Sequence, residues 1–396
     1  MDIARFEALP VGELLPIKVE EATGRFVEHF AFNPSPLPDQ VDLKPSTWAA
    51  AIDASHDLGR LDAVARERLP SPALLARPTI RREAVSTSAL EGTFAPAADV
   101  LISEIDSDRP RTQAVTEILN FIRATERGIE LLEDLPVCIR MAKELQGILI
   151  AGTPSDDWQR GKIRQTQVLI GPYQGCGIRE ALFVPPPPGQ HLEAGLDSWE
   201  RWVNLDNDLH PIVKIAMSHY QFEALHPFTD GNGRIGRLLA ILQLMQAELI
   251  QDPLINLSPY FESRSDRYRQ LLREVSISGD WDTWITFFCS ALSSQARDAE
   301  LRIRDLLAWR DETVELLKRN KVKGVALDIA ARLIEYPSVT VKLVADTHPV
   351  SVQAANNAVN RLLEMGVLEE VTGKSYNRVF QAPGIFEILF RPSTQV

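Results

Sequence analysis

The chain has 396 residues, which at about 150 residues per domain indicates two or three domains and excludes a single small module. Its 42 Lys and Arg residues against 54 Asp and Glu give a formal net charge of −12, which excludes a general polyanion-binding protein. Hydrophobic residues make up 45% and charged residues 24%, which is enough to build sizeable cores and excludes global disorder.

The cysteines and the N-terminus indicate the compartment. Cys138, Cys176 and Cys289 are an odd, scattered trio without metal-binding spacing, which argues against a disulfide framework and for a reducing environment. Residues 1–10 lack the pattern of a signal peptide, and no uncharged apolar run of 18 residues occurs. We therefore expect a cytoplasmic protein with no membrane partner.

The chain begins with a proline-rich stretch. Residues 1 to about 45 lack sustained periodicity, so we expect an irregular arm that wraps on the rest. From Thr47 onward, apolar residues recur mostly at helical spacing. The sequence therefore predicts a mainly α fold, in which residues 1–110 form the arm and N-terminal helices and residues 111–300 form a helical core.

The helical pattern is interrupted between residues 165 and 184. Two short apolar runs, 168–170 and 181–184, flank a glycine-rich stretch, which predicts a β-hairpin inserted among helices. The four prolines at 185–188 cannot donate backbone hydrogen bonds, so they end the second strand before a helix around 196–203.

The C-terminal part has its own pattern. We expect residues 301–324 to form a helical linker, because helical spacing continues to about Arg319 and Gly324 follows three basic residues. Residues 325–396 then contain three helical segments, the third opened by a Ser351 cap, followed by two short apolar runs. Three helices and a hairpin predict a winged helix-turn-helix domain.

One stretch concentrates residues suited to chemistry. It runs from His226 to Arg237 with the sequence HPFTDGNGRIGR, between an amphipathic helix over 212–224 and another from Arg234 to about Met245. The loop 229–233 therefore lies at a helix N-terminus, where backbone N–H groups and the helix dipole favour an anion such as a phosphate. Gly231 and Gly233 leave room for a ligand to approach the backbone.

The charged residues of this stretch fit the same interpretation. Arg234 and Arg237 place two cations at a helix N-terminus against the dipole, and a polyphosphate would neutralise both. Asp230 offers a hard oxygen for Mg²⁺, and Asn232 offers a neutral donor. His226 can accept a proton near neutral pH. The residues predict a phosphate cradle, a metal ligand and a base within twelve positions.

The stretch resembles the signature of the Fic family, which reads His, any residue, Phe, any residue, Asp or Glu, Gly-Asn-Gly-Arg, two free positions, Arg, and every fixed position is met. The resemblance implies a Fic-type helical bundle at 111–300 whose hairpin, the flap at 165–184, holds a target segment by strand addition. It also implies a protein adenylyltransferase that moves AMP from ATP to a Ser, Thr or Tyr hydroxyl of a target protein or of itself.

The resemblance assigns roles to individual residues. His226 is implied as the base, Asp230 as the Mg²⁺ ligand, and Arg234 and Arg237 as the grips on the β- and γ-phosphates. The stretch 231–233, that is Gly231, Asn232 and Gly233, is implied to cradle the α- and β-phosphates of the co-substrate ATP. Gly233 favours AMP transfer because kinase-like relatives carry Lys there.

A second segment resembles the inhibitory helix of the same family. In the expected helix at about 83–92, Thr87 and Glu91 are four residues apart on one face, and Gly92 suits a C-terminal cap. The resemblance implies that Glu91 pairs with Arg237 and deprives the γ-phosphate of its clamp. We therefore expect an autoinhibited enzyme.

Other readings stay open. Relatives on this scaffold transfer UMP, phosphocholine or a phosphoryl group, and removal of AMP by the same site is a further possibility. A DNA-binding regulator acting through residues 325–381 is an alternative from another class, but that segment has a net charge of −1, so docking to protein or homodimerisation is favoured over nucleic acid. His219 has no partners at metal-binding spacing, and we expect a core residue there.

Overall fold

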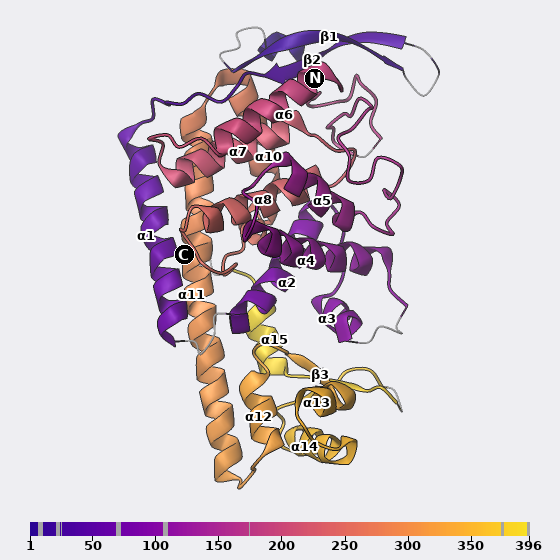
Figure 1. Cartoon of the computed structure of the whole chain (residues 1–396), viewed down its shortest axis with the longest axis vertical. Helices are drawn as coiled ribbons and strands as arrows, with labels where there is room; N and C mark the ends of the chain where they lie inside the picture. Colours follow the sequence, from indigo (N-terminus) through magenta and orange to yellow (C-terminus); the bar gives the residue numbers. More distant parts are fainter. Residues whose placement is uncertain are drawn as a thin grey trace. The chain divides into compact units, whose positions relative to one another are not determined.

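The computed structural model describes residues 1–6, 11–20, 24, 26–68, 73–105, 110–173, 175–373 and 376–393. Most of this chain is helical, which confirms the mainly α class (Figure 1). The chain divides into two compact units. The first unit contains Met1–Leu58, Asn120–Gln251 and Tyr260–Ser293. The second unit contains Gly59–Leu119, Asp252–Pro259 and Ser294–Val396.

The helices fall into three groups. Those within the first unit are η1 (Ile3–Phe6), α5 (Ile139–Leu149), α6 (Gln190–Val203), α7 (Pro211–Leu225), α8 (Asn232–Gln246) and α10 (Ser265–Ser278). Those within the second unit are α2 (Ala73–Leu90), α3 (Ala97–Ile105), α12 (Val325–Arg332), α13 (Val341–Thr347), α14 (Val352–Glu364) and α15 (Pro383–Phe390). Helices that contribute to both units are α1 (Pro45–Arg68), α4 (Gln113–Leu132), α9 (Ser258–Glu262) and α11 (Trp281–Arg319).

The expectation of an irregular N-terminal arm is wrong. Strands β1 (Gly12–Glu20) and β2 (Phe26–Pro34) pair along their whole length as an antiparallel ribbon (Figure 1). Side chains of β1 alternate between partly buried Ile17 and Val19 and exposed Lys18 and Glu20. Pro16 interrupts that alternation in the sequence, but each strand of a two-stranded ribbon has a free edge, where a missing N–H is tolerated.

The flap at 165–184 is a hairpin reduced to one antiparallel bridge, between Ile170 and Phe183. The N–H of each residue donates to the carbonyl of the other, and both distances are 3.0 Å. On the other side of this segment, the Phe32 N–H of β2 donates to the Val184 carbonyl at 2.8 Å. Ala31 of β2 also belongs to the small buried cluster that contains Val184. The N-terminal ribbon therefore supports the flap from its outer edge.

Helices α7 and α8 form the centre of the first unit. Almost all of their residues are buried, and Gly236 allows the two helices to approach closely, because a Cβ there would lie 2.5 Å from a Glu223 carboxylate oxygen and 3.2 Å from the Phe222 ring. Trp284 and Phe288 of α11 are fully buried against this centre. The packing fixes both helices whose ends carry the HPFTDGNGRIGR stretch.

The C-terminal residues form four helices, α12 to α15, and a small sheet. The first three helices and the sheet are consistent with the expected winged helix-turn-helix, and α15 follows them. Strands β3 (Ser338–Thr340), β4 (Glu369–Glu370) and β5 (Val379–Gln381) lie in the order β3-β5-β4. The predicted Ser351 cap is confirmed, because its hydroxyl accepts the Ala354 N–H at 3.2 Å. Residues 301–319, expected to be part of a linker, continue helix α11 without a break.

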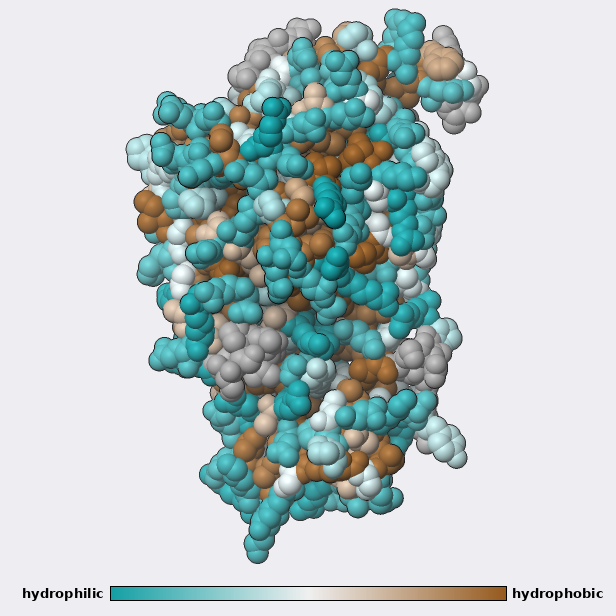
Figure 2. Space-filling model, viewed as in Figure 1, coloured by the Kyte–Doolittle hydropathy of each residue, from teal (hydrophilic) through white to brown (hydrophobic). Residues whose placement is uncertain are grey.

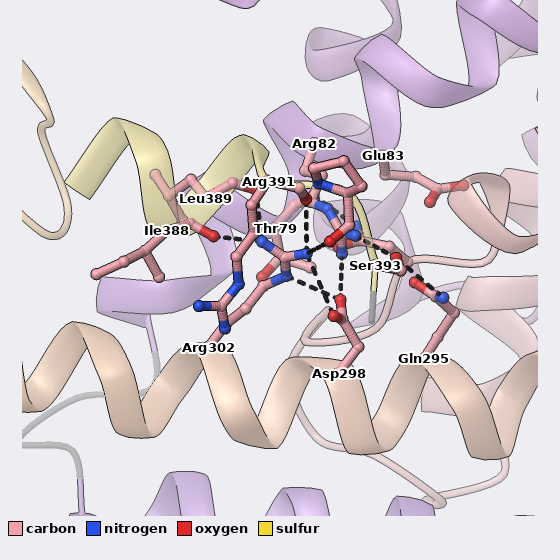
Figure 3. A network of polar contacts seen from close by, with 12 residues as sticks. Thr79, Arg82, Glu83, Gln295, Asp298, Arg302, Ile388, Leu389, Arg391 and Ser393 are labelled. Carbon is pink, nitrogen blue, oxygen red and sulfur yellow. Dashed lines mark hydrogen bonds and ion pairs between the residues drawn. The ribbon is translucent and has the colours of Figure 1, made fainter. Parts of the chain in front are cut away.

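A buried polar network joins α2, α11 and α15 within the second unit (Figure 3). Asp298 of α11 lies 3.0 Å from Arg82 of α2 and 2.8 Å from Arg302, so one carboxylate serves two guanidinium groups. Arg302 also donates to the carbonyls of Ile388, Leu389 and Arg391. Burial and the nearby Arg302 lower the pKa of Arg82 to about 10. The C-terminal helix is thus held by charge-assisted hydrogen bonds.

On the face shown in Figure 2, hydrophobic residues are interspersed with hydrophilic ones. Within the described part of the chain, no helix is both long enough and apolar enough to cross a membrane.

Candidate active site

The HPFTDGNGRIGR stretch is the junction between α7 and α8. Helix α7 ends at Leu225, and His226 caps it in the left-handed conformation with φ 49°. Helix α8 begins at Asn232 after Gly231, whose φ of 82° is also left-handed. Two left-handed residues therefore turn the chain between the end of one helix and the start of the next, and the turn carries His226 and Asp230.

The His226 imidazole has a defined orientation. Its Nδ1 lies 3.3 Å from the Glu223 carbonyl, one turn earlier in α7. A carbonyl oxygen can only accept, so the Nδ1 atom of the neutral ring carries the hydrogen and Nε2 is the basic nitrogen. The backbone N–H of His226 donates to the Phe222 carbonyl at 3.0 Å. The end of α7 therefore presents an imidazole whose Nε2 can take a proton.

The loop is closed by Asn232. Its side-chain oxygen accepts the Phe228 N–H and its side-chain nitrogen donates to the Phe228 carbonyl, both at 2.8 Å. Phe228 is fully buried, and its ring centroid lies 6.4 Å from that of Phe222, so this residue anchors the loop. The two bonds to Phe228 fix the Asn232 side chain across the loop, and its backbone N–H lies at the start of α8.

Asp230 is the carboxylate of the site. One oxygen accepts the Gly231 N–H at 2.6 Å and lies 3.4 Å from Arg234, and the other accepts the Ser155 hydroxyl at 2.5 Å. Its backbone carbonyl accepts the Gln146 amide at 3.2 Å. Its side chain keeps 36% exposure, so a partly open hard oxygen remains at the loop. No group of three or more metal-ligating side chains occurs among the residues that the structure describes.

The start of α8 is built to hold an anion. Helix geometry gives no intrahelical acceptor to the N–H groups of Asn232, Gly233 and Arg234, and the helix dipole adds positive potential there. Arg234 and Arg237 rise from the same turn and are 4% and 1% exposed. Two buried guanidinium groups beside the backbone amides of a helix N-terminus favour a ligand with several negative charges.

His219 supports this turn from behind and is a core residue, as expected. Its Nδ1 lies 3.1 Å from the Gly236 carbonyl, and its Nε2 lies 2.7 Å from the Tyr268 hydroxyl. The ring is stacked on Trp284. Burial, followed by the positive charge of Arg237, lowers the pKa of His219 to about 3. His219 therefore stays neutral and fixes the first turn of α8.

Three site residues were missed by the sequence analysis. Ser155 and Gln146 hold Asp230, and Arg164 donates to the carbonyl of His226. Ser155 precedes Asp230 by 75 residues, and Arg164 binds backbone atoms, so neither contact leaves a local pattern in the sequence. The sequence offers one signal for Arg164: it directly precedes the flap and has no acidic residue within four positions.

The expected inhibitory segment lies in the second unit at the end of α2. Thr87 is fully buried in the helix, and Glu91 follows directly after its last residue, Leu90. Gly92 adopts φ 85° and donates its N–H to the Ala89 carbonyl at 2.9 Å, which ends the helix as expected from its sequence. Thr87 and Glu91 therefore lie one turn apart at the C-terminal end of α2.

Comparisons with known proteins agree with this geometry. Residues 136–244 match the Fic/DOC family model, and residues 48–130 match the model named Fic/DOC family N-terminal. The protein adenylyltransferase Fic of Drosophila grimshawi is 32% identical over 158 residues, 39% of this chain and 30% of that protein. That of Drosophila ananassae is 30% identical over 167 residues, 41% of this chain and 31% of that protein. The match thus spans less than a third of these relatives.

Solved structures share the fold. A Fic family protein from Desulfovibrio desulfuricans G20 aligns with a TM-score of 0.56 and 20% identity over 87% of this chain and 98% of that chain. Fic-1 from C. elegans aligns with a TM-score of 0.52 and 21% identity over 66% of this chain and 74% of that chain. The two family models and the complete motif at the junction of α7 and α8 show that residues 48–130 and 136–244 belong to the Fic/DOC family.

Proposed function

We propose that the protein is an adenylyltransferase that transfers AMP from ATP to a Ser, Thr or Tyr hydroxyl of a target protein or of itself. The observation that carries the proposal is the junction of α7 and α8. It places the oriented imidazole of His226 next to a helix N-terminus that bears two buried guanidinium groups, those of Arg234 and Arg237. The names of the Drosophila relatives support the same reaction.

The proposed reaction is a displacement at the α-phosphorus. Nε2 of His226 accepts the hydroxyl proton while the hydroxyl oxygen forms a bond to the α-phosphorus. The bond from that phosphorus to the bridging oxygen of the β-phosphate breaks, and pyrophosphate leaves with the bonding electron pair. The product is an AMP ester of the side chain, and the imidazolium returns its proton to solvent.

In the proposed reaction, the start of α8 binds the nucleotide. The backbone N–H groups of residues 231–233 cradle the α- and β-phosphates, Arg234 holds the β-phosphate and Arg237 the γ-phosphate. Asn232 contributes its backbone N–H, while its side chain closes the loop on Phe228. These contacts stabilise the charge on the departing pyrophosphate.

Asp230 fits a magnesium ion. Mg²⁺ is commonly held by one or two carboxylates together with substrate phosphates, and Asp230 offers one partly exposed carboxylate beside the proposed phosphate site. The bound ion would neutralise phosphate charge. Ser155 and the Gly231 N–H orient the Asp230 carboxylate for that role.

A test of the proposed base is His226→Ala. We expect transfer to fall by about 10²- to 10⁴-fold while ATP binding persists, because the imidazole acts on the hydroxyl and not on the nucleotide. His191→Ala, which removes an exposed imidazole from α6, is the matched control and should behave as the unmodified chain. Full transfer by His226→Ala would remove this residue from the reaction.

We propose in addition that Glu91 inhibits the enzyme by pairing with Arg237. The proposed inhibitory segment also contains Thr87, one turn before Glu91. Glu91→Gly should then raise transfer, and adding Arg237→Ala should cancel most of the gain. Glu133→Gly is the matched control, because Glu133 also follows directly after the last residue of a helix, α4. A folded Glu91→Gly protein that is no faster than the unmodified chain would end the inhibition hypothesis.

A further inference from the structure

Arg164, which precedes the flap, is buried without a carboxylate. It is 1% exposed, and no Asp or Glu lies within ion-pair distance of it in the part of the chain that the structure describes. Burial lowers the pKa of its guanidinium to about 10, so it still carries its charge at neutral pH. A buried charge is costly, and an apolar side chain would fill the same space. The reason for a buried guanidinium at this position must therefore lie in the groups to which it donates hydrogen bonds.

All four side-chain partners of Arg164 are backbone carbonyls. Nε donates to His226 at 2.7 Å, and one terminal nitrogen donates to Leu225 at 3.3 Å, so two carbonyls at the negative end of the α7 dipole are satisfied. The other bonds reach Thr166 at the start of the flap, at 3.2 Å, and Pro186 in the proline run that follows the flap, at 2.6 Å. One planar group thus binds three separate segments of the first unit.

The backbone of Arg164 adds a further link. Its N–H donates to the carbonyl of Pro227 at 2.9 Å. Arg164 therefore binds the carbonyls of two consecutive residues, His226 and Pro227. His226 is the residue whose left-handed φ of 49° sets the direction of the imidazole. A residue that is neither glycine nor asparagine needs such outside contacts to hold that conformation.

We propose that Arg164 is a positioning residue that holds His226, the start of the flap and the proline run after the flap in one rigid frame. The inference rests on the proposed function, in which the flap holds the target and His226 takes its proton. A hydroxyl held by the flap meets the imidazole only if the two are fixed relative to each other, and an error near 1 Å can cost about 10²-fold in rate. The side-chain hydrogen bonds of Arg164 go to His226, Leu225, Thr166 and Pro186 and not to Asp230 or α8, so its replacement should leave nucleotide binding unaffected.

The test replaces Arg164 in the full-length chain. Arg164→Met keeps a long side chain but removes the hydrogen-bond donors. Arg164→Lys keeps the positive charge but removes the planar guanidinium group. Arg160→Met is the matched control, since Arg160 belongs to the same segment but is exposed and pairs with Asp156. The readouts are self-modification from ATP labelled in the α-phosphate, affinity for the α,β-methylene analogue of ATP with Mg²⁺, and hydrogen exchange measured by mass spectrometry.

We expect Arg164→Met to lose about 10²-fold in self-modification while its affinity for the analogue stays unchanged. Amides of 165–184 and 226–230 should exchange faster, and those of α10 should not change. Arg164→Lys should recover part of the rate, and Arg160→Met should match the unmodified chain. If neither the unmodified chain nor any variant transfers AMP, but hydrogen exchange in Arg164→Met rises at the flap and at His226, the positioning role of Arg164 is supported and the proposed function is wrong.

Two results would overturn the inference. The first is unchanged exchange and unchanged transfer in Arg164→Met. The second is a loss of analogue affinity together with faster exchange throughout the first unit in both Arg164 variants, which would make Arg164 a residue of general folding and not of positioning.

Discussion

Gly231 is the position where one methyl group tests the geometry of the anion site. It caps α8 with φ 82°, and a Cβ added there would lie 2.7 Å from the Leu149 side chain. A left-handed residue with a side chain costs about 1–2 kcal/mol. The contact with Leu149 adds an overpacking cost of about 1–3 kcal/mol. We therefore expect Gly231→Ala to lose about 2–5 kcal/mol of unfolding free energy.

Gly152→Ala is the control for this prediction. Gly152 is also left-handed, with φ 68°, but no heavy atom lies within 4 Å of its added Cβ. It should lose only the conformational cost of about 1–2 kcal/mol. Since 1 kcal/mol corresponds to about 2–4 °C in a domain of this size, Gly231→Ala should melt about 2–12 °C below Gly152→Ala.

The same substitution should affect transfer. Ordinary contact begins near 3.4 Å, so the N-cap of α8 or Leu149 must move by about 0.7 Å to admit the methyl group of Gly231→Ala. A displacement of that size at the phosphate cradle should reduce AMP transfer by up to about 10²-fold, whereas Gly152→Ala should retain it. Thermal unfolding by circular dichroism and label incorporation from ATP would measure both effects. Equal melting temperatures and equal rates in the two variants would refute the reasoning.

Three further predictions concern charged groups. Asp298→Asn should cost about 3–5 kcal/mol in urea unfolding, because it leaves Arg82 and Arg302 buried without that carboxylate, and a loss below about 1 kcal/mol would contradict the network. The depressed pKa of His219 confines its protonation to the unfolded chain, so stability should fall by about 1.4 kcal/mol per pH unit as pH drops below 6.5 toward 3. His219→Gln should remove that part of the slope, and an unchanged slope would refute the assignment. EDTA should abolish transfer and Asp230→Ala should mimic it, whereas activity in EDTA would exclude the metal role of Asp230.

The sequence predicted those parts of the site whose partners are close in the chain. The junction of α7 and α8 was predictable because twelve consecutive residues carry the helix end, the turn and the next helix start. The Ser351 cap and the end of α2 at Gly92 follow from the same kind of local signal.

The rest depends on contacts between distant segments. The N-terminal ribbon was missed because Pro16 breaks its alternation, while its pairing is stabilised by the docking of β2 on Val184. Arg164 was missed because its partners are carbonyl oxygens, which every residue carries. Ser155 reaches Asp230 across 75 residues. Tertiary packing creates these contacts, and no local sequence pattern records them.

The central claim, AMP transfer by the junction of α7 and α8, is tested most directly by the position of the label. Glu91→Gly protein should be incubated with Mg²⁺ and ATP labelled in either the α- or the γ-phosphate, with a His226→Ala version as the control. We predict that the protein retains the α-label, releases the γ-label as pyrophosphate, and retains neither when His226 is replaced. Retention of the γ-label, or α-labelling that persists without His226, would contradict the account.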